Sequence, residues 1–332
     1  MMTRRDFFIS TAALAAGCRT SGGGKAGQPA SQFNNNHSVF LSDVHVSPSV
    51  SPDDSYQLAS FRRCIDEILA MRPLPARAVV FGDIALGKGM TADYETSRPE
   101  FLRLVEAGIK VHYTMGNHDH REPFLRVFPE AAADMHVKGR FASVVSLGAW
   151  YDLLLLDSLD EIGKGEGEPT VGTGTIDEAQ LNWLEDVVSR AKRPFICGAH
   201  HSPRELSFVS NGQRRGVLQK LKESELYMGW VQGHGHCWAK SFNACSSTNP
   251  LATFRLLCLP STGYWGDIGY ANVYSHPDGI VITPRIWDFY YPRPARDGEV
   301  RPKCWDDIVM EKGNDVCKFA SPIDYSNVPL SW

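Results

Sequence analysis

The sequence predicts an α/β fold in which parallel strands are covered by helices. Short apolar runs alternate along the chain with segments whose apolar residues recur at helical spacing. Clusters of histidine and aspartate follow several of the apolar runs. The chain has 332 residues, of which 43% are hydrophobic, so it can bury a full core within one large domain or two ordinary ones.

The first half of the fold reads as strand, helix, strand, helix, strand. Residues 38–43, 76–83 and 109–117 are the apolar runs that predict strands. One helix is expected over residues 99–108, where Gly108 would end it. The first helix is predicted from an apolar stripe that consists of Leu58, Phe61, Ile65, Ile68 and Leu69. This order implies parallel strands with helices packed on them.

The second half continues the alternation with a glycine-rich loop, residues 162–174. A capping box formed by Thr175 and Glu178 predicts the start of a helix over residues 176–192. The remaining strand-like runs are residues 141–147, 150–158, 193–199, 226–233, 253–261 and 279–289.

The N-terminal residues 1–17 resemble a twin-arginine export signal. Arg4 and Arg5 precede an apolar segment that is too short to span a bilayer, and small residues follow it. The alternative is a tail that carries the two arginines by chance. Cys18 follows a box similar to that of lipoproteins, with plain cleavage nearby as an equal alternative. We therefore expect export by the twin-arginine route to the periplasm or cell envelope, with Cys18 as a candidate lipid anchor.

The rest of the chain is expected to divide into three parts. Residues 18–36 form a linker rich in Gly, Ser, Pro and Gln, residues 37–290 form the folded domain, and residues 291–332 form a C-terminal extension. The eight cysteines show no C-x-x-C pair, so a zinc ribbon is excluded. Cys304 and Cys317 could form one disulfide in an oxidising compartment.

The charge distribution limits the class of partner. The formal net charge is −4, and basic and acidic residues are interspersed without a block of like charge. This excludes a nucleic-acid footprint and a polybasic membrane surface. A small-molecule substrate or one with a single phosphate is easier to reconcile with this balance.

Five polar clusters are expected to converge on one site. Each lies just past the C-terminal end of an apolar run, where the functional crevice of an open α/β sheet forms. The clusters are Asp43 with His45, Asp83, Asn117 with His118 and Asp119, His200 with His201, and His234 with His236.

The chemistry of these side chains suits metal ions. Carboxylates and imidazoles bind divalent Mn, Fe, Zn or Ni. If Asp43 and His45 lie on an extended segment, their spacing points both side chains to one side, and the same holds for His234 and His236. Two sets of about four ligands fit two ions ~3.5–4 Å apart, provided that one carboxylate is shared.

The ordered motifs D-x-H, G-D, G-N-H-D, H and G-H-x-H resemble those of the calcineurin-like metallophosphoesterase superfamily, from Val39 to Trp238. This resemblance implies two packed mixed β-sheets flanked by helices, in a four-layer α-β-β-α sandwich. Within the superfamily the motifs look most like small bacterial phosphodiesterases of the class III cyclic nucleotide and glycerophosphodiester type. Purple acid phosphatases are disfavoured, because Leu86 stands where they have a tyrosine iron ligand.

The resemblance also assigns roles to single residues. His118 would stabilise the transferring phosphoryl group or protonate the leaving oxygen, and Asp119 would hydrogen-bond His118. His201 would shape the pocket, and His120 is expected at the loop surface. Asp83 would bridge two metal ions, of which one is held by Asp43, His45 and His236 and the other by Asn117, His200 and His234.

These assignments predict a dinuclear-metal hydrolase of phosphoesters, with phosphodiesters preferred over monoesters. The resemblance implies that a metal-bridging hydroxide is the nucleophile. The alternative is a noncatalytic metal-binding scaffold or interaction module on the same fold. The enzyme interpretation is favoured because such scaffolds lose ligands or the catalytic histidine, whereas this chain retains the complete set.

Overall fold

A computed structural model describes the chain from Gln32 onward. The described residues are 32–49, 56–161, 165–170, 172–203, 205–208, 221, 224–241, 256–290 and 308–311. The chain divides into two units, Met1–Ser31 and Gln32–Trp332, and the described residues all belong to the second.

The first sheet has six strands in the spatial order β14-β13-β12-β1-β2-β3. Strands β1, β2 and β3 run parallel, and β12 pairs antiparallel with β1. The antiparallel pairs β12–β13 and β13–β14 complete the sheet, which is therefore mixed. Its strands are β1 (Phe33–Leu41), β2 (Leu74–Phe81), β3 (Lys110–Thr114), β12 (Gly266–His276), β13 (Gly279–Tyr290) and β14 (Ile308–Glu311).

The second sheet also has six strands, in the order β10-β11-β9-β7-β5-β4. Its four central strands are parallel, and β10 and β4 pair antiparallel at the two edges. Its strands are β4 (Ser143–Ser146), β5 (Asp152–Leu155), β7 (Phe195–Ala199), β9 (Tyr227–Gln232), β10 (Ala239–Ser241) and β11 (Leu256–Cys258). A separate parallel pair consists of β6 (Thr175–Ile176) and β8 (Ser207–Phe208).

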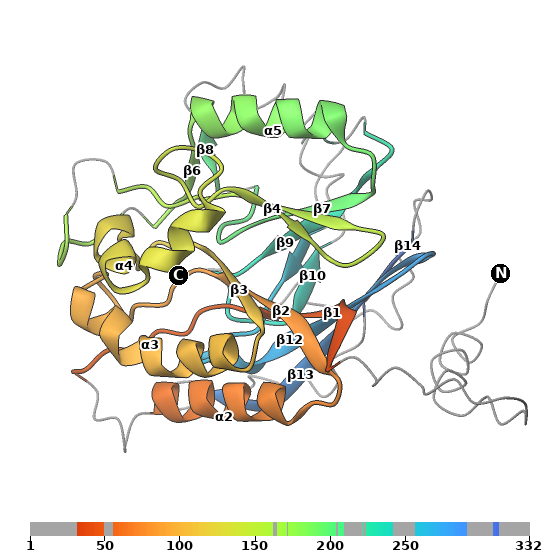
Figure 1. Cartoon of the computed structure of the whole chain (residues 1–332). Helices are drawn as coiled ribbons and strands as arrows, with labels where there is room; N and C mark the ends of the chain where they lie inside the picture. The colour runs from red at the N-terminus through yellow and green to blue at the C-terminus, as the bar shows by residue number, and fades with distance from the viewer. Residues whose placement is uncertain are drawn as a thin grey trace, which may run out of the picture. The chain divides into compact units, whose positions relative to one another are not determined.

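Helices cover the outer face of each sheet. Figure 1 shows α2 and α3 together on one side of the first sheet and α5 on the far side of the second. The helices are α2 (Tyr56–Ala70), α3 (Thr91–Glu106), α4 (Arg121–Val127) and α5 (Glu178–Arg190), with a short 3-10 helix, η1 (Pro129–Asp134).

Alternation along β1 shows how the layers are held together. Val39 and Leu41 pack in the same cluster as Phe61 of α2, on the helix side of the first sheet. Phe40, which points to the opposite face, packs in a second cluster with Ile196 of β7. Strand β1 therefore separates a helix–sheet core from a sheet–sheet core.

A third apolar cluster closes the other side of the sandwich. Leu181 and Leu184 of α5 pack with Leu154 and Cys197 of the second sheet. All four side chains are almost fully buried. The layers are thus helix, sheet, sheet and helix, which confirms the predicted α-β-β-α sandwich.

Two elements begin earlier than the sequence patterns suggested. Strand β1 includes the last residues of the segment expected to be a linker, because Phe33 packs against the core and pairs with Leu74. Helix α3 begins at Thr91 instead of residue 99 and contains Pro99 in its interior. Its first turn is stabilised by Asp93, whose carboxylate accepts the Met90 backbone N–H at 3.2 Å.

The start of α5 and one whole strand were also predicted wrongly. The side chain of Asp177 caps α5 by accepting the Gln180 N–H, whereas Thr175 lies in β6 and donates to Asp160. Strand β12, which lies between β1 and β13, was missed because its sequence, GDIGYANVYSH, mixes glycine and polar residues with the apolar ones and so forms no apolar run.

Parts of the expected organisation lie outside the described residues. These are the signal segment 1–17, the lipid-anchor candidate Cys18 and the pair Cys304 and Cys317. Within the C-terminal extension, β14 joins the first sheet. Among the described residues, no helix is both long and apolar enough to cross a membrane.

Candidate metal centre

All five predicted clusters lie at the C-terminal ends of parallel strands. Asp43 and His45 follow β1, Asp83 follows β2, and Asn117 follows β3. In the second sheet, His200 follows β7, and His234 and His236 follow β9. The strand ends of the two sheets therefore bring the predicted ligands together.

Many of these residues have a left-handed backbone. The φ angles are 54° at Asp43, 49° at His45, 51° at Asp83, 63° at His234 and 49° at His236. This conformation is uncommon for residues other than glycine, and it is retained where surrounding structure enforces it, typically at functional sites. The expectation that the paired residues lie on extended segments was wrong: tight turns direct these side chains.

Four side chains form the first candidate metal group. One ligand atom from each of Asp43, His45, Asp83 and His236 lies within 4.8 Å of the others, and all four residues are buried. His236 Nε2 is 3.1 Å from Asp43 Oδ1 and 3.2 Å from His45 Nε2. His45 Nε2 is also 3.5 Å from Asp83 Oδ2.

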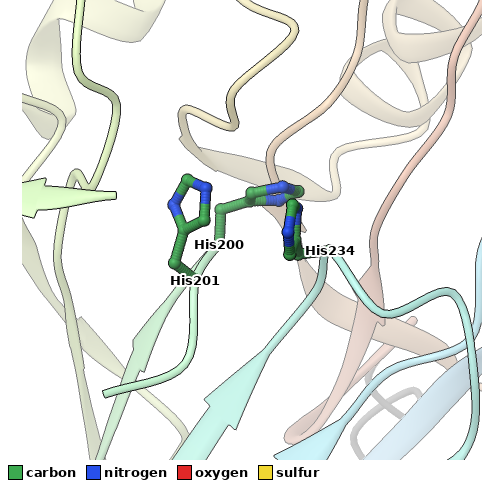
Figure 2. A group of neighbouring side chains, drawn as sticks. All are labelled: His200, His201 and His234. Carbon is green, nitrogen blue, oxygen red and sulfur yellow. The ribbon is translucent and has the colours of Figure 1, made fainter. Parts of the chain in front are cut away.

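The second candidate metal group consists of His200, His201 and His234, whose ligand atoms also lie within 4.8 Å of one another. Figure 2 shows the three imidazoles side by side at the ends of β7 and β9. His200 Nε2 lies 3.1 Å from Asn117 Oδ1 and 3.2 Å from Asp83 Oδ2. Asp83 therefore contacts both groups, as expected for a shared carboxylate.

Hydrogen bonds at the far side of two candidate ligands, His200 and His236, fix their orientation. His200 Nδ1 lies 2.7 Å from the Phe81 carbonyl oxygen, and His236 Nδ1 lies 3.1 Å from the Trp265 carbonyl oxygen. These contacts hold a proton on Nδ1, so a metal ion can take the place of a proton at Nε2. Ser42, which belongs to none of the sequence motifs, donates its hydroxyl to Asp43 Oδ2 at 2.5 Å.

The electrostatics of the cluster favour a bound cation. Burial opposes ionisation of Asp43 and Asp83, but neighbouring histidines more than offset it and hold both carboxyl pKa values below their usual range. Burial lowers the pKa of His200, yet Asp83 outweighs it and raises the value to about 10. Two buried carboxylates thus draw a positive charge to the site. With several imidazole nitrogens facing the same space, this donor set fits hard or borderline divalent ions.

Glycines let the strand ends approach closely. A Cβ on Gly116 would lie 2.2 Å from Asp83 Oδ1 and 2.5 Å from the Asp83 backbone nitrogen. A Cβ on Gly233 would lie 2.0 Å from Ser42 Oγ and 2.9 Å from Asp43 Oδ2. A side chain at either position would therefore displace a predicted ligand.

His118 lies beside the metal groups without belonging to either of them. Its backbone N–H donates to Asp83 Oδ1 at 2.8 Å, and its ring packs edge-on against His45, with centroids 4.9 Å apart. His118 Nδ1 lies 3.2 Å from the Gly87 carbonyl oxygen. The ring is only partly buried, so a substrate could reach it.

The predicted hydrogen bond between Asp119 and His118 was wrong. Asp119 Oδ1 accepts the backbone N–H groups of Ile84 and Ala85, each at 3.1 Å, and Oδ2 accepts the Gly116 N–H at 3.0 Å. Asp119 therefore ties the segment after β2 to the segment after β3, which positions both loops. Burial, followed by repulsion from Asp83, raises the pKa of the Asp119 carboxyl to about 6.

The expectation that His120 lies at the loop surface was also wrong, because this residue is 2% exposed. His120 Nε2 is 2.9 Å from the Glu168 carbonyl oxygen, and His120 Nδ1 is 3.2 Å from Glu161 Oε2. Thr170 Oγ1 donates to the Asn117 carbonyl oxygen. Residues 165–170 are thus held against the turn that carries Asn117 and His118, a contact no local sequence pattern could indicate.

His201 is a further candidate ligand that the sequence assigned only to the pocket. It is fully buried, and its Nδ1 lies 2.9 Å from Ser158 Oγ. Burial and the neighbouring His200 lower its pKa, so the imidazole is neutral near pH 7. The adjacent pair His200–His201 is the sequence feature that could have identified His201 as a candidate ligand.

Comparison with known proteins agrees with this geometry. The family model of calcineurin-like phosphoesterases matches residues 37–238. No curated protein matches the chain.

Several solved structures are similar at low identity. A predicted phosphoesterase from Streptococcus pneumoniae is 13% identical; the match covers 82% of this chain and 97% of that chain, with a TM-score of 0.33. A Vps29 single mutant from Entamoeba histolytica is 11% identical, covering 75% and 92% with a TM-score of 0.35. A protein serine/threonine phosphatase from Saccharomyces cerevisiae is 10% identical, covering 86% and 81% with a TM-score of 0.32.

The family assignment rests on the family model, whose match spans more than half of the chain and includes every residue of the two candidate metal groups. The chain belongs to the calcineurin-like phosphoesterase family.

Proposed function

We propose that this protein hydrolyses phosphoesters, with phosphodiesters preferred over monoesters, at a centre that holds two divalent metal ions. The observation that carries the proposal is the position of Asp83. One of its oxygens lies 3.5 Å from His45 Nε2 and 3.2 Å from His200 Nε2, so a single carboxylate faces both candidate groups. This is the arrangement that a two-metal site requires.

Each ion would have its own set of protein ligands. Asp43, His45 and His236 would hold one ion together with Asp83. Asn117, His200 and His234 would hold the other, also with Asp83, because Asn117 and Asp83 both lie within 3.2 Å of His200 Nε2. The ions, when bound, would supply an activated water molecule as nucleophile and neutralise charge on the phosphoryl oxygens.

His118 is suited to act on the leaving group. Its Nδ1–H can donate to the Gly87 carbonyl oxygen, which fixes the orientation of the ring. A protonated Nε2 can then give its proton to the departing oxygen. The contact with Asp83 through the His118 backbone N–H keeps this residue next to the metal centre.

The charge around the second metal group supports the preference for diesters. Glu205 Oε1 lies 4.0 Å from His234 Nε2, and the Glu205 side chain is 39% exposed, at the rim of the group. A monoester carries a second negative charge near pH 7, which this carboxylate would repel, whereas a diester carries only one. The resemblance of the motifs to small bacterial phosphodiesterases agrees with this argument.

The test is hydrolysis of bis-p-nitrophenyl phosphate and of p-nitrophenyl phosphate by protein loaded with Mn, Fe, Zn or Ni. We expect faster turnover of the diester. Asp83→Asn should lose bound metal and activity together, and His118→Ala should keep metal but lose about 10²–10⁴-fold in kcat. His136→Ala, a histidine on the exposed surface, is the matched control and should behave as the wild type.

Two outcomes would contradict the proposal. Unchanged activity in Asp83→Asn and His118→Ala would show that the site is assigned wrongly. Absence of activity with all four metals, in protein that binds them, would favour a noncatalytic scaffold.

We further propose that the protein is exported by the twin-arginine route. This rests on Arg4 and Arg5 before a short apolar segment, with Cys18 as a candidate lipid anchor. Fractionation of a double Arg4→Lys, Arg5→Lys variant tests the route, and unchanged export would refute it. Labelling with a fatty-acid analogue, compared between wild type and Cys18→Ser, tests the anchor.

A further inference from the structure

Two thiols lie together beneath the turn that carries His234 and His236. A Cβ on Gly235 would be 2.7 Å from Cys258 Sγ and 3.6 Å from Cys237 Sγ. Both cysteines are unpaired in the structure. Because Gly235 has no side chain, the two sulfur atoms share the space beside its Cα atom.

The two cysteines come from segments that frame the ligand turn. Cys237 follows His236 directly, and Cys258 is the last residue of β11, where it pairs with Gln232 of β9. Cys258 Sγ also donates to the Gly233 carbonyl oxygen at 3.4 Å. A covalent link between the sulfurs would therefore join the end of the ligand turn to the strand that supports its beginning.

We propose that Cys237 and Cys258 are a redox-modified pair, which a low-molecular-weight disulfide converts to an intramolecular disulfide that staples the ligand turn to β11. In the first step, Cys237 sulfur bonds to one sulfur of the reagent, whose S–S bond breaks and releases a thiol. In the second step, Cys258 sulfur displaces the remaining reagent thiol from Cys237. The pair loses two electrons and two protons, and one reagent disulfide is reduced to two thiols.

The attack is assigned to Cys237 because this residue is partly exposed, whereas Cys258 is buried. The two thiols are neighbours in the space beside Gly235. The other described cysteines lack such a neighbour: Cys64 and Cys197 are buried in separate apolar clusters of α2 and β7.

The staple has two expected consequences. It closes a loop from Cys237 to Cys258 in the unfolded chain. This lowers the conformational entropy of the unfolded state and should raise the melting temperature. It should also slow loss of the ion held by His236, because that residue adjoins Cys237 in sequence; this second consequence rests on the proposed function.

Peptide mapping tests the link directly. Full-length protein is treated with oxidised glutathione, alkylated and digested with trypsin. Cleavage after Lys222, Lys240, Arg255 and Arg285 puts Cys237 and Cys258 in separate peptides, 223–240 and 256–285, with Cys245 in the peptide between them. We expect peptides 223–240 and 256–285 joined by a disulfide, and joined peptides that contain Cys245 instead would overturn the proposal.

Variants provide the second measurement. Oxidation should raise the melting temperature of the wild type by roughly 5 °C, and Cys237→Ser and Cys258→Ser should show no rise. Cys197→Ser is the matched control, since its thiol is buried elsewhere, and should respond as the wild type does. Absence of the joined peptides with an unchanged melting temperature would refute the staple.

Metal release separates this inference from the proposed function. We expect the oxidised wild type to lose metal to a chelator several-fold more slowly than the reduced protein. If the joined peptides form but the protein binds no metal, the proposed function fails and the staple stands. If the protein binds metal and hydrolyses the diester but no joined peptides form, the staple fails and the proposed function stands.

Discussion

Gly116→Ala should damage the candidate metal centre without replacing any of its ligands. The added methyl carbon would lie 2.2 Å from Asp83 Oδ1, 2.5 Å from Asp83 N and 2.8 Å from Asp83 Cγ. The contact with the backbone nitrogen cannot be relieved by rotating a side chain, so the segment after β2 and the segment after β3 must move apart by about 1 Å to restore ordinary van der Waals distances.

The magnitude has two parts. Overpacking of this kind costs about 1–3 kcal/mol in unfolding free energy. Separation of the segments also strains the 2.8 Å bond from His118 N to Asp83 Oδ1, so we expect about 3 kcal/mol in total. A displacement of about 1 Å at Asp83 should lower kcat/KM roughly 10²-fold.

The assay combines denaturant unfolding, metal content and hydrolysis of an activated diester. Gly87→Ala is the matched control, because a Cβ there meets no atom within 4 Å although Gly87 contacts His118 through its carbonyl oxygen. It should change stability by less than about 1 kcal/mol. If Gly116→Ala unfolds like Gly87→Ala and keeps its metal, the close approach of the two segments does not hold the site together.

Three further predictions concern the buried side chains of Tyr94 and His37 and the removal of metal. Tyr94→Phe should cost about 2 kcal/mol in unfolding free energy, because the hydroxyl accepts the buried His120 N–H at 2.7 Å and donates to Asp119; no loss in a denaturation curve would contradict this. Burial, opposed by a hydrogen bond with Asn272, lowers the pKa of His37 to about 4. The unfolded chain takes up this proton near pH 6.5 but the folded chain only near pH 4, so stability should fall by about 3 kcal/mol as the pH drops between these values. His37→Gln should lack this slope, and equal slopes in the two proteins would refute the assignment. Removal of metal by a chelator should lower the melting temperature and restoring the metal should recover it, since ligands that bind the folded state stabilise it; a melting temperature that does not respond would contradict a metal centre.

The alternation of strands and helices could be predicted from the sequence because buried strands and amphipathic helices have different spacings of apolar residues. Three errors show where this signal ends. In strand β12, Gly266, Asp267 and Gly269 interrupt the apolar residues, so no apolar run marks the strand. Pro99 was taken as a helix start although it lies inside α3. Thr175 was taken as a helix cap, whereas Asp177 caps α5.

The sequence predicted which residues form the candidate site, but not the contacts that hold them in place. Metal ligands must be particular residue types, so Asp83 and His200 are visible in a single sequence. The partners of Asp119 are mostly backbone N–H groups, which every residue except proline carries, so no motif could identify Ile84 and Ala85 among them. The burial of His120 depends likewise on residues 165–170, which lie far from it in sequence.

The sequence by itself determined the fold class, the order of the strands that carry the site and the identity of its candidate ligands, because these are properties of local periodicity and of side-chain chemistry. Only the tertiary structure decided how the ligands group around Asp83, which loops Asp119 joins and which thiols meet beneath Gly235. Those arrangements arise from left-handed turns at strand ends and from the packing of two sheets, and both depend on contacts between residues that are distant along the chain.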